Sequence, residues 1–352
     1  MDRSTTISPS SRSRWRSRHA SHWVCACDRL RWHRNGCKAI MQVPIDVKVV
    51  VRSADAPAIW CIGLTIISVT AALLLVGIYD WRGAAVVGLW SMLVALAAMC
   101  FRAAFQLLRN GKFDIEGYAR TIFFILLAAI NLGAFNPLKG WLNRFGFWAD
   151  PLLAEIDQII FLGHDPWEML TWASHALTAE YYSRAWFIVT LICVPLAAFW
   201  RRGAALATYF LIWGPLALIP QAMMQAGGPI FYERLGYGDR FSDLPYPDLV
   251  ANYADYLWRL HSEGSFGMGS GISGMPSVHV MTATWVALLL FPTRARWAGV
   301  AFAVSILLLS VAIGWHYAVD GLFGAALVLA AYTMISKLLP DAAEPARFRQ
   351  EG

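Results

Sequence analysis

Eight long apolar runs occupy most of the sequence after residue 57 and strongly limit the folds open to it. Each is near the roughly 20 residues that a helix needs to cross a hydrocarbon core of about 30 Å. A segment in lipid must satisfy its own backbone hydrogen bonds, which favours helices. We therefore predict an all-α polytopic membrane bundle of about eight spans, namely Ala58–Tyr79, Ala84–Leu108, Tyr118–Phe135, Ala185–Trp200, Ala204–Met224, Pro276–Phe291, Trp297–Trp315 and Val319–Leu338.

The composition also favours the bilayer as solvent. Hydrophobic residues make up 58% of the 352 residues and charged residues only 15%, which is too apolar for a soluble surface of that size. Seventeen Trp and twelve Tyr suit two aromatic belts at headgroup level. The net charge of +6 comes from basic residues in the N-terminal tail and in short connectors, so we expect no nucleic-acid partner.

The basic connectors predict an orientation, because Lys and Arg are retained on the cytoplasmic side during insertion. We expect a multi-pass protein of the cell (inner) membrane with both termini cytoplasmic. The long connectors Asn136–Arg184 and Gly227–Met275 then lie outside. Apolar spacing predicts short amphipathic helices at Pro151–Leu162 and Pro166–Leu177, lying on the outer interface or packed against the bundle. The basic residues that support this orientation are Arg109 with Lys112, Arg201 with Arg202, Arg294 with Arg296, and Lys337.

These patterns divide the chain into four parts: a basic tail at 1–56, two additional spans at 57–110, the six remaining spans at 111–340 and a C-terminal tail at 341–352. In the first tail, Cys25, Cys27, His33 and Cys37 could be read as a zinc site. The C-x-C spacing is poor for zinc and no core surrounds it, so a disordered tail is favoured. No metal or other cofactor is expected.

Two histidines and an aspartate stand where the predicted spans meet the outer face. His279 lies where one span begins, and His316 and Asp320 lie where the next span emerges and turns into the last. The topology alone brings them to one surface. Ionisable groups beside membrane spans are costly and mark candidate functional sites.

The segment before His279 favours anion binding. Pro276 suits the first turn of a helix and Ser277 is polar at the same end, so free backbone N–H groups and the positive end of the helix dipole would point outward. The glycine-rich run 264–274 lets the backbone approach an anion closely. His279 would stand one turn inside, near a bound phosphate.

His316 and Asp320 are four residues apart, which places them on one helical face. A carboxylate that accepts from one ring nitrogen fixes the imidazole tautomer and leaves the other nitrogen as a nucleophile or base. A second histidine could protonate the departing oxygen. The alternative is that each histidine is simply packed or exposed to water, as a lone H-x-x-x-D would allow.

At these residues the sequence resembles the type 2 phosphatidic acid phosphatase superfamily, particularly the branch with the inositol phosphorylceramide synthases. Pro276–His279 and His316–Asp320 are similar to two of its signatures, and together they are specific. Supporting similarity to the branch comes from Gly228-Pro229 with the aromatic residues up to Tyr232, and from Asp157–Pro166. The resemblance covers roughly Ile156 to Ala325.

The resemblance implies a six-helix core, a metal-independent reaction and a phosphohistidine intermediate. By position, His316 would be the nucleophile, Asp320 its orienting partner and His279 the acid for the leaving group. Gly228, Pro229 and Tyr232 would shape the substrate site. Two features depart from the superfamily pattern: the usual Ser-Arg pair before the nucleophile reads Leu309-Ser310 here, and the opening Lys and Arg signature is not evident near Gly228.

Some cation or set of donors must therefore hold the phosphate. Ser277 at the helix start is one candidate. Arg234 and Arg240, which follow the Gly-Pro motif, are preferred to Arg184, although either could be an ordinary surface arginine.

We therefore predict an integral membrane phosphatase or phosphotransferase that acts on a lipid phosphate or phospho-headgroup at the extracytoplasmic face. A water acceptor would make it a hydrolase, and a polyol or lipid acceptor a transferase. The alternative is a non-catalytic lipid-binding or transport protein that retains the fold.

Overall fold

The computed structural model describes residues 56–108, 114–267 and 269–339, and all regular structure in these ranges is helical. The predicted all-α membrane bundle is confirmed. Within these described ranges, six helical segments are long and apolar enough to cross a membrane, and two shorter apolar helices accompany them. The predictions for the two tails, including the cysteines near residue 30, lie outside the described residues.

The eight apolar runs each correspond to a helical segment. The six long segments are Ala56–Val76 (α1, Ala56–Ala71, with a π-helical end), α2 (Trp81–Leu108), Ile115–Phe145 (α3, Ile115–Leu142, with a short 3₁₀ end), Ala176–Phe199, Gly203–Met223 and α12 (Ala318–Leu338), and the shorter helices are α10 (Val278–Leu290) and α11 (Arg296–Ala312).

The core of the bundle lies around α10, which packs against α11, α12, α7 and α6. Trp285 of α10 is completely buried, and its indole N–H donates to the carbonyl of Ala205 at 2.7 Å. A buried tryptophan needs a partner for this donor, so the bond fixes α10 against α7 (Gly203–Ile212). The first two helices pack on α3, α6 and α7.

The third span is longer than the sequence predicts. α3 continues seven residues beyond Phe135 and contains Pro137, whereas the apolar pattern of the sequence predicted an outer connector from Asn136. The Asn136 side chain donates to Asp80 at 3.1 Å, which supports the helix where the proline removes a backbone donor. As a result Lys139 sits on the last turns of a helix and not in a loop.

The fourth span also begins earlier than predicted. It is a continuous segment made of α5 (Ala176–Glu180), a π-helical turn (Tyr181–Ala185) and α6 (Trp186–Phe199). Single π-helical turns inside α-helices often occur at functional sites. This one carries Tyr182 and Ser183 at the end of the bundle where α10 and α12 begin.

The fifth span is interrupted at Gly214, between α7 and α8 (Pro215–Met223). A residue before proline is disfavoured in the α conformation, which accounts for the position of the break. The Asn131 side chain donates to the Trp213 carbonyl at 2.6 Å, so this carbonyl at the break keeps a buried partner.

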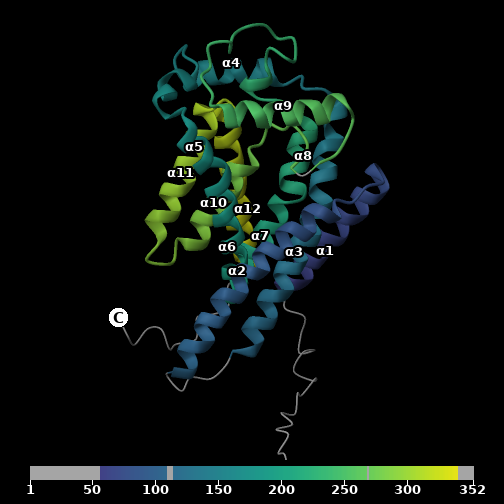
Figure 1. The fold of residues 1–352 in the computed structure, drawn as a ribbon, viewed down its shortest axis with the longest axis vertical. Helices are drawn as coiled ribbons and strands as arrows, with labels where there is room; N and C mark the ends of the chain where they lie inside the picture. The colour runs from purple at the N-terminus through teal and green to yellow at the C-terminus, as the bar shows by residue number, and fades with distance from the viewer. Residues whose placement is uncertain (1–55, 109–113, 268, 340–352) are drawn as a thin grey trace, which may run out of the picture. The chain divides into compact units, whose positions relative to one another are not determined.

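Two amphipathic helices lie across the end of the bundle where α10 and α12 begin, which we call the site end (Figure 1). α4 (Asp150–Ile160) matches the helix expected at Pro151–Leu162. The second expected helix is instead a 3₁₀ segment at Pro166–Ala173, and the chain enters α5 by Ala176. α9 (Asp248–Ser262) was not predicted.

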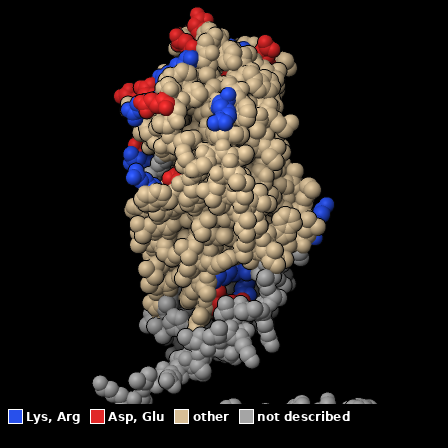
Figure 2. Space-filling view, turned by 90° about the vertical axis from the view of Figure 1, so that its right-hand side faces the viewer, with Lys and Arg blue, Asp and Glu red and all other residues tan. Residues whose placement is uncertain are grey.

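Charged side chains are unevenly distributed on the surface. On the face in Figure 2 they gather mainly toward the site end, and a broad region beyond them carries almost none. Exposed hydrophobic residues such as Leu74, Phe101 and Leu338 are on the long helices. This pattern is what lipid contact requires, because exposed charge in a hydrocarbon core is costly.

Candidate active site

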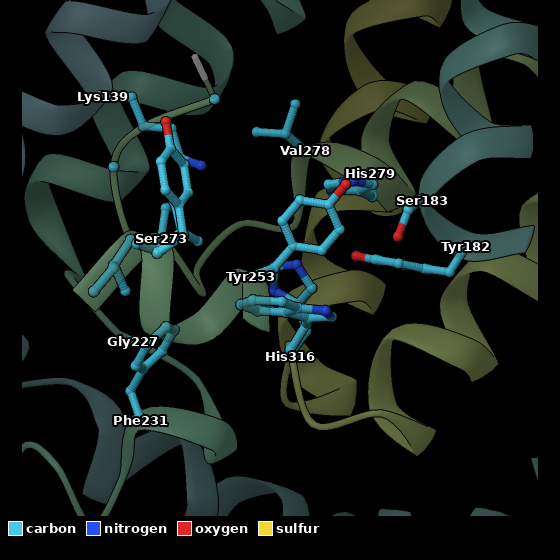
Figure 3. A pocket seen from close by; sticks show the side chains of 16 residues that line it. Lys139, Tyr182, Ser183, Gly227, Phe231, Tyr253, Ser273, Val278, His279 and His316 are labelled. Atoms are coloured by element: carbon cyan, nitrogen blue, oxygen red, sulfur yellow. The ribbon is translucent and has the colours of Figure 1, made fainter. Parts of the chain in front are cut away.

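A cavity of about 240 Å³ opens at the site end, and both histidines line it. Its walls come from α3, the π-helical turn, the loop before Phe231, α9, the glycine-rich loop and the turn before α12. Figure 3 shows His279 and His316 near one another, with Tyr182 beside them and Lys139 across the cavity. The cavity lining includes Lys139, Tyr182, Ser273, His279 and His316.

His316 is held by a backbone carbonyl. Its ring Nδ1 lies 2.8 Å from the carbonyl oxygen of Gly274, and the side chain is only 7% exposed. A carbonyl oxygen can only accept, so Nδ1 must carry the proton in this bond. In the neutral ring Nε2 then keeps its lone pair, as a nucleophile requires.

Asp320 lies next to His316, but the Gly274 carbonyl is closer to the His316 ring than the Asp320 carboxylate is. The carboxylate Oδ2 is 3.7 Å from His316 Nδ1, within ion-pair range, and accepts the backbone N–H of Tyr317 at 3.0 Å. Asp320 is fully buried, and its Oδ1 has no hydrogen-bond partner within the described ranges. The carboxylate therefore caps the start of α12 and offers negative charge beside the imidazole.

The turn that carries His316 is fixed by the end of α11. The carbonyl of Ser310 accepts the N–H of Trp315 at 3.0 Å and of His316 at 3.2 Å. Gly314 takes a positive φ of 76°, which a turn of this kind requires. Ser310 is at one of the two positions that correspond to the Ser-Arg pair of the resembled superfamily pattern. In this chain its backbone carbonyl stabilises the turn.

His279 lies in the first turn of α10 and is held by aromatic rings. Its imidazole stacks on Tyr182 with centroids 4.7 Å apart and packs on Trp186 at 3.9 Å. The Trp186 indole donates to the His279 carbonyl at 3.2 Å. These contacts fix the ring plane and leave its nitrogens for the cavity.

Ser277 is the N-cap of α10, where its side chain accepts the N–H of Val280 at 3.4 Å. The helix begins at Val278, so Pro276 precedes the cap and does not occupy the first turn as the sequence suggested. Ser277 is completely buried and does not line the cavity, whereas its neighbour Val278 does.

The arginines considered from the sequence are paired elsewhere. Arg234 forms an ion pair with Asp255 of α9, and Arg184 pairs with Glu180. Arg240 bonds both carboxylate oxygens of Asp165, and this pairing is the main reason that the Arg240 pKa rises above its usual value. None of the three arginines lines the cavity.

The Gly-Pro segment lies behind the cavity wall. Gly227 and Phe231 face the cavity, while Gly228, Pro229 and Tyr232 do not. Gly228 packs directly on the turn before His316, where a Cβ would lie 2.3 Å from the Trp315 carbonyl oxygen. Tyr232 packs with Phe241 and Tyr237.

Lys139 is a cavity residue that was not predicted from the sequence. It reaches the cavity from the end of α3, and none of the ion pairs among the described residues includes it. A lysine close to the end of a long apolar run was the available signal, but the run was taken to stop before Asn136.

Two polar groups of the cavity wall also lack partners. The Tyr182 hydroxyl belongs to a side chain that is 3% exposed, and neither it nor the Ser273 hydroxyl has a hydrogen-bond partner within the ranges described. Buried hydroxyls are normally bonded, so both are available to a bound molecule.

Two aspartates of α4 support the site from outside the cavity. Asp157 accepts the N–H groups of Ala318 and Val319 at 2.7 and 2.9 Å. Asp150 accepts the N–H groups of Gly227 and Gly228 at 2.7 and 2.8 Å. Burial raises the pKa of each carboxyl to about 6, although the bonds that each accepts act in the opposite direction.

The apolar helix bundle defines the protein as a polytopic membrane protein, and its cavity places two histidines at one end of the helices. A comparison with protein-family models then matches the PAP2 superfamily over residues 152–334, just over half of the chain. The chain belongs to the PAP2 superfamily. No curated protein and no solved structure matches the sequence significantly.

The matched region contains His279, His316, Asp320 and Asp157, while Lys139 lies outside it. Membership in the superfamily is consistent with a lipid phosphatase or phosphotransferase. The match is to the superfamily as a whole and gives no support to the inositol phosphorylceramide synthase branch in particular.

The close packing of Gly228 generates a prediction about stability. Gly228→Ala should lower the apparent unfolding midpoint in detergent much more than Gly236→Ala. Both glycines have positive φ, 96° and 83°, so a side chain is disfavoured by the backbone conformation at either position. Only at Gly228 does the new Cβ also meet a backbone carbonyl, since nothing lies within 4 Å at Gly236. Equal midpoints for the two variants would contradict the described contact.

Proposed function

We propose that the protein is an integral membrane phosphatase or phosphotransferase that acts on a lipid phosphate or phospho-headgroup through a phosphohistidine at His316. The observation that carries the proposal is the bond from His316 Nδ1 to the Gly274 carbonyl at 2.8 Å, in a ring that lines a cavity with a second histidine. Membership in the PAP2 superfamily supports the same chemistry.

In the first step, the lone pair on His316 Nε2 attacks phosphorus, and the phosphorus–oxygen bond to the lipid alcohol breaks. His279, in its protonated form, gives its proton to the departing oxygen. The phosphorylated imidazole becomes cationic, because Nδ1 keeps its proton. The Asp320 carboxylate, 3.7 Å from Nδ1, stabilises that positive charge.

In the second step, neutral His279 takes a proton from the acceptor as the acceptor oxygen attacks phosphorus. The phosphorus–nitrogen bond breaks, and its electron pair returns to His316 Nε2. Water as acceptor yields hydrolysis, and a polyol or lipid hydroxyl yields transfer. No metal takes part in this scheme.

Lys139 is the cation that we assign to the phosphate. Phosphoryl transfer spreads negative charge over the equatorial oxygens, and a cation in the cavity would stabilise it. Arg234 and Arg240 are paired outside the cavity, and Ser277 is occupied as a helix cap. Lys139 lines the cavity beside Ser273, whose unpartnered hydroxyl can donate to the same phosphate.

We further propose that residues 111–340 form the catalytic core and that α1 and α2 brace it. The site end faces the extracytoplasmic side, because the basic residues of the α6–α7 and α10–α11 connectors are at the opposite end. Arg201 pairs there with Glu116 at 3.2 Å.

The nucleophile makes the first functional prediction. His316→Ala should lower phosphate release from lipid phosphates by at least about 10³-fold, because it removes the attacking atom. His164→Ala is the control, since His164 is an exposed histidine paired with Glu168. Both purified variants should keep the unfolding midpoint of the wild type within a few degrees. Retained turnover in folded His316→Ala would refute the proposed nucleophile.

Lys139→Met should lower kcat/KM by about 10²- to 10³-fold, as the loss of one preorganised transition-state donor does in other enzymes. Methionine keeps most of the side-chain length and removes the charge. Lys139→Arg should recover part of the loss. Lys337→Met, which removes an exposed lysine from the last turn of α12, is the matched control and should behave as wild type. Wild-type kinetics in Lys139→Met would rule out this assignment.

The orientation can be tested by labelling. In a cysteine-free background, Ser242→Cys should react with a membrane-impermeant maleimide on intact cells. Ala295→Cys, between α10 and α11, should react only after permeabilisation. Both positions are exposed on the described surface. The opposite labelling pattern would place the cavity on the cytoplasmic side.

A further inference from the structure

α4 presents two carboxylates toward the interior although the helix lies at the protein's outer end. Asp150 and Asp157 are seven residues apart, close to two helical turns, and so share a face. They are 0% and 1% exposed. A buried carboxylate is costly unless it is well bonded, so the partners of this pair indicate what the helix holds.

Asp157 holds the start of α12. Its two oxygens accept the N–H groups of Ala318 and Val319, the first two residues of that helix. These donors have no partner inside the helix, and a negative charge there also favours the helix dipole. His316 lies two residues before this bidentate contact.

Asp150 bonds two segments of the chain that are distant in sequence. It accepts the N–H groups of Gly227 and Gly228, and also the Tyr317 hydroxyl at 2.8 Å. Tyr317 directly follows His316. The carboxylate therefore links the Gly-Pro loop to the nucleophile's own turn.

The Gly-Pro loop also bonds Gly274, the residue whose carbonyl accepts the His316 proton. The Ala226 carbonyl accepts the N–H of Gly274 at 2.6 Å, and the Gly274 carbonyl accepts from His316. Ala226 immediately precedes the glycine that Asp150 holds. The backbone on both sides of the His316 side chain is thus connected to α4.

We propose that Asp150 and Asp157 are positioning residues that hold His316 in line for attack, although neither touches the cavity. Asp157 fixes the helix start that follows the ring. Asp150 fixes the loop that supports the ring's carbonyl acceptor. The inference rests on the proposed function, because it assigns α4 a role in the same reaction.

The test compares Asp150→Asn and Asp157→Asn with wild type in detergent, using phosphatidic acid and a prenyl phosphate as substrates. Each change keeps the side-chain shape but turns an amide N–H toward backbone donors. We expect kcat to fall about 10- to 100-fold, as a small misplacement of a reacting group does. KM should stay within about two-fold, because the cavity wall keeps its residues.

Glu155→Gln is the matched control, since it makes the same chemical change at an exposed position of α4. It should leave kcat and KM unchanged. A general weakening of the fold would instead lower the unfolding midpoint and reduce the active fraction.

A milder pair of variants covers the possibility that the aspartate variants fail to fold. Tyr317→Phe removes only the hydroxyl that bonds Asp150, and it should lower kcat about three- to ten-fold at constant KM. Tyr237→Phe removes a comparable bond, from the Tyr237 hydroxyl to the Phe147 carbonyl at 3.0 Å. That bond involves neither Asp150 nor the turn that carries His316, so the change should have no effect on kcat.

The outcomes separate the two claims. If wild type turns over, His316→Ala does not, and both Tyr317→Phe and the folded aspartate variants retain wild-type kcat, the positioning role is overturned while the proposed function stands. If wild type releases or transfers no phosphate from either lipid, the proposed function fails and the positioning role fails with it.

Discussion

The bond between the His316 imidazole and the Gly274 carbonyl joins the two loops from which the site is built. One loop leads into α10, whose first turn holds His279, and the other leads into α12, whose first turn holds Asp320. Since the bond is 2.8 Å long and buried, it determines the protonated nitrogen as well as the direction of the ring. The roles proposed for the cavity, for His279 and for α4 all depend on the position of the His316 ring.

The bilayer explains why so much polar structure is concentrated at one end. Long apolar helices leave little room for charge along their length, so the buried carboxylates gather where the helices begin. Free N–H groups at helix starts and in glycine loops need acceptors there, and aspartates supply them. The polar network at the end of the bundle therefore also supports the residues of the proposed reaction.

Much of this could be predicted from the sequence. The apolar runs predicted the eight apolar helical segments of the described residues, six of which are long enough to cross a membrane. Topology brought His279 and His316 to one end, because consecutive spans alternate in direction. The extension of α3 could not be predicted in the same way. Asn136 and Pro137 suggest a turn, and only the Asp80 contact and packing around α3 keep the helix intact. Lys139 was missed for that reason.

Partners that are distant in sequence were equally hard to foresee. His316 and Asp320 have the spacing of a bonded pair, yet a carbonyl from the other loop makes the shorter contact. Asp150 and Asp157 resemble ordinary charges of an amphipathic interfacial helix. Their burial depends on how α4 lies on α12, which local periodicity does not encode. The arginines after the Gly-Pro segment were plausible phosphate ligands until their acidic partners were placed.

The most direct test of the account is to find the covalent intermediate. Wild-type protein mixed with a labelled lipid phosphate and quenched at alkaline pH, where phosphohistidine survives, should be digested and sequenced by mass spectrometry. The account predicts a phosphoryl group on His316 and none in His316→Ala. A phosphoryl group on His279 or another residue, or turnover without any labelled histidine, would contradict it.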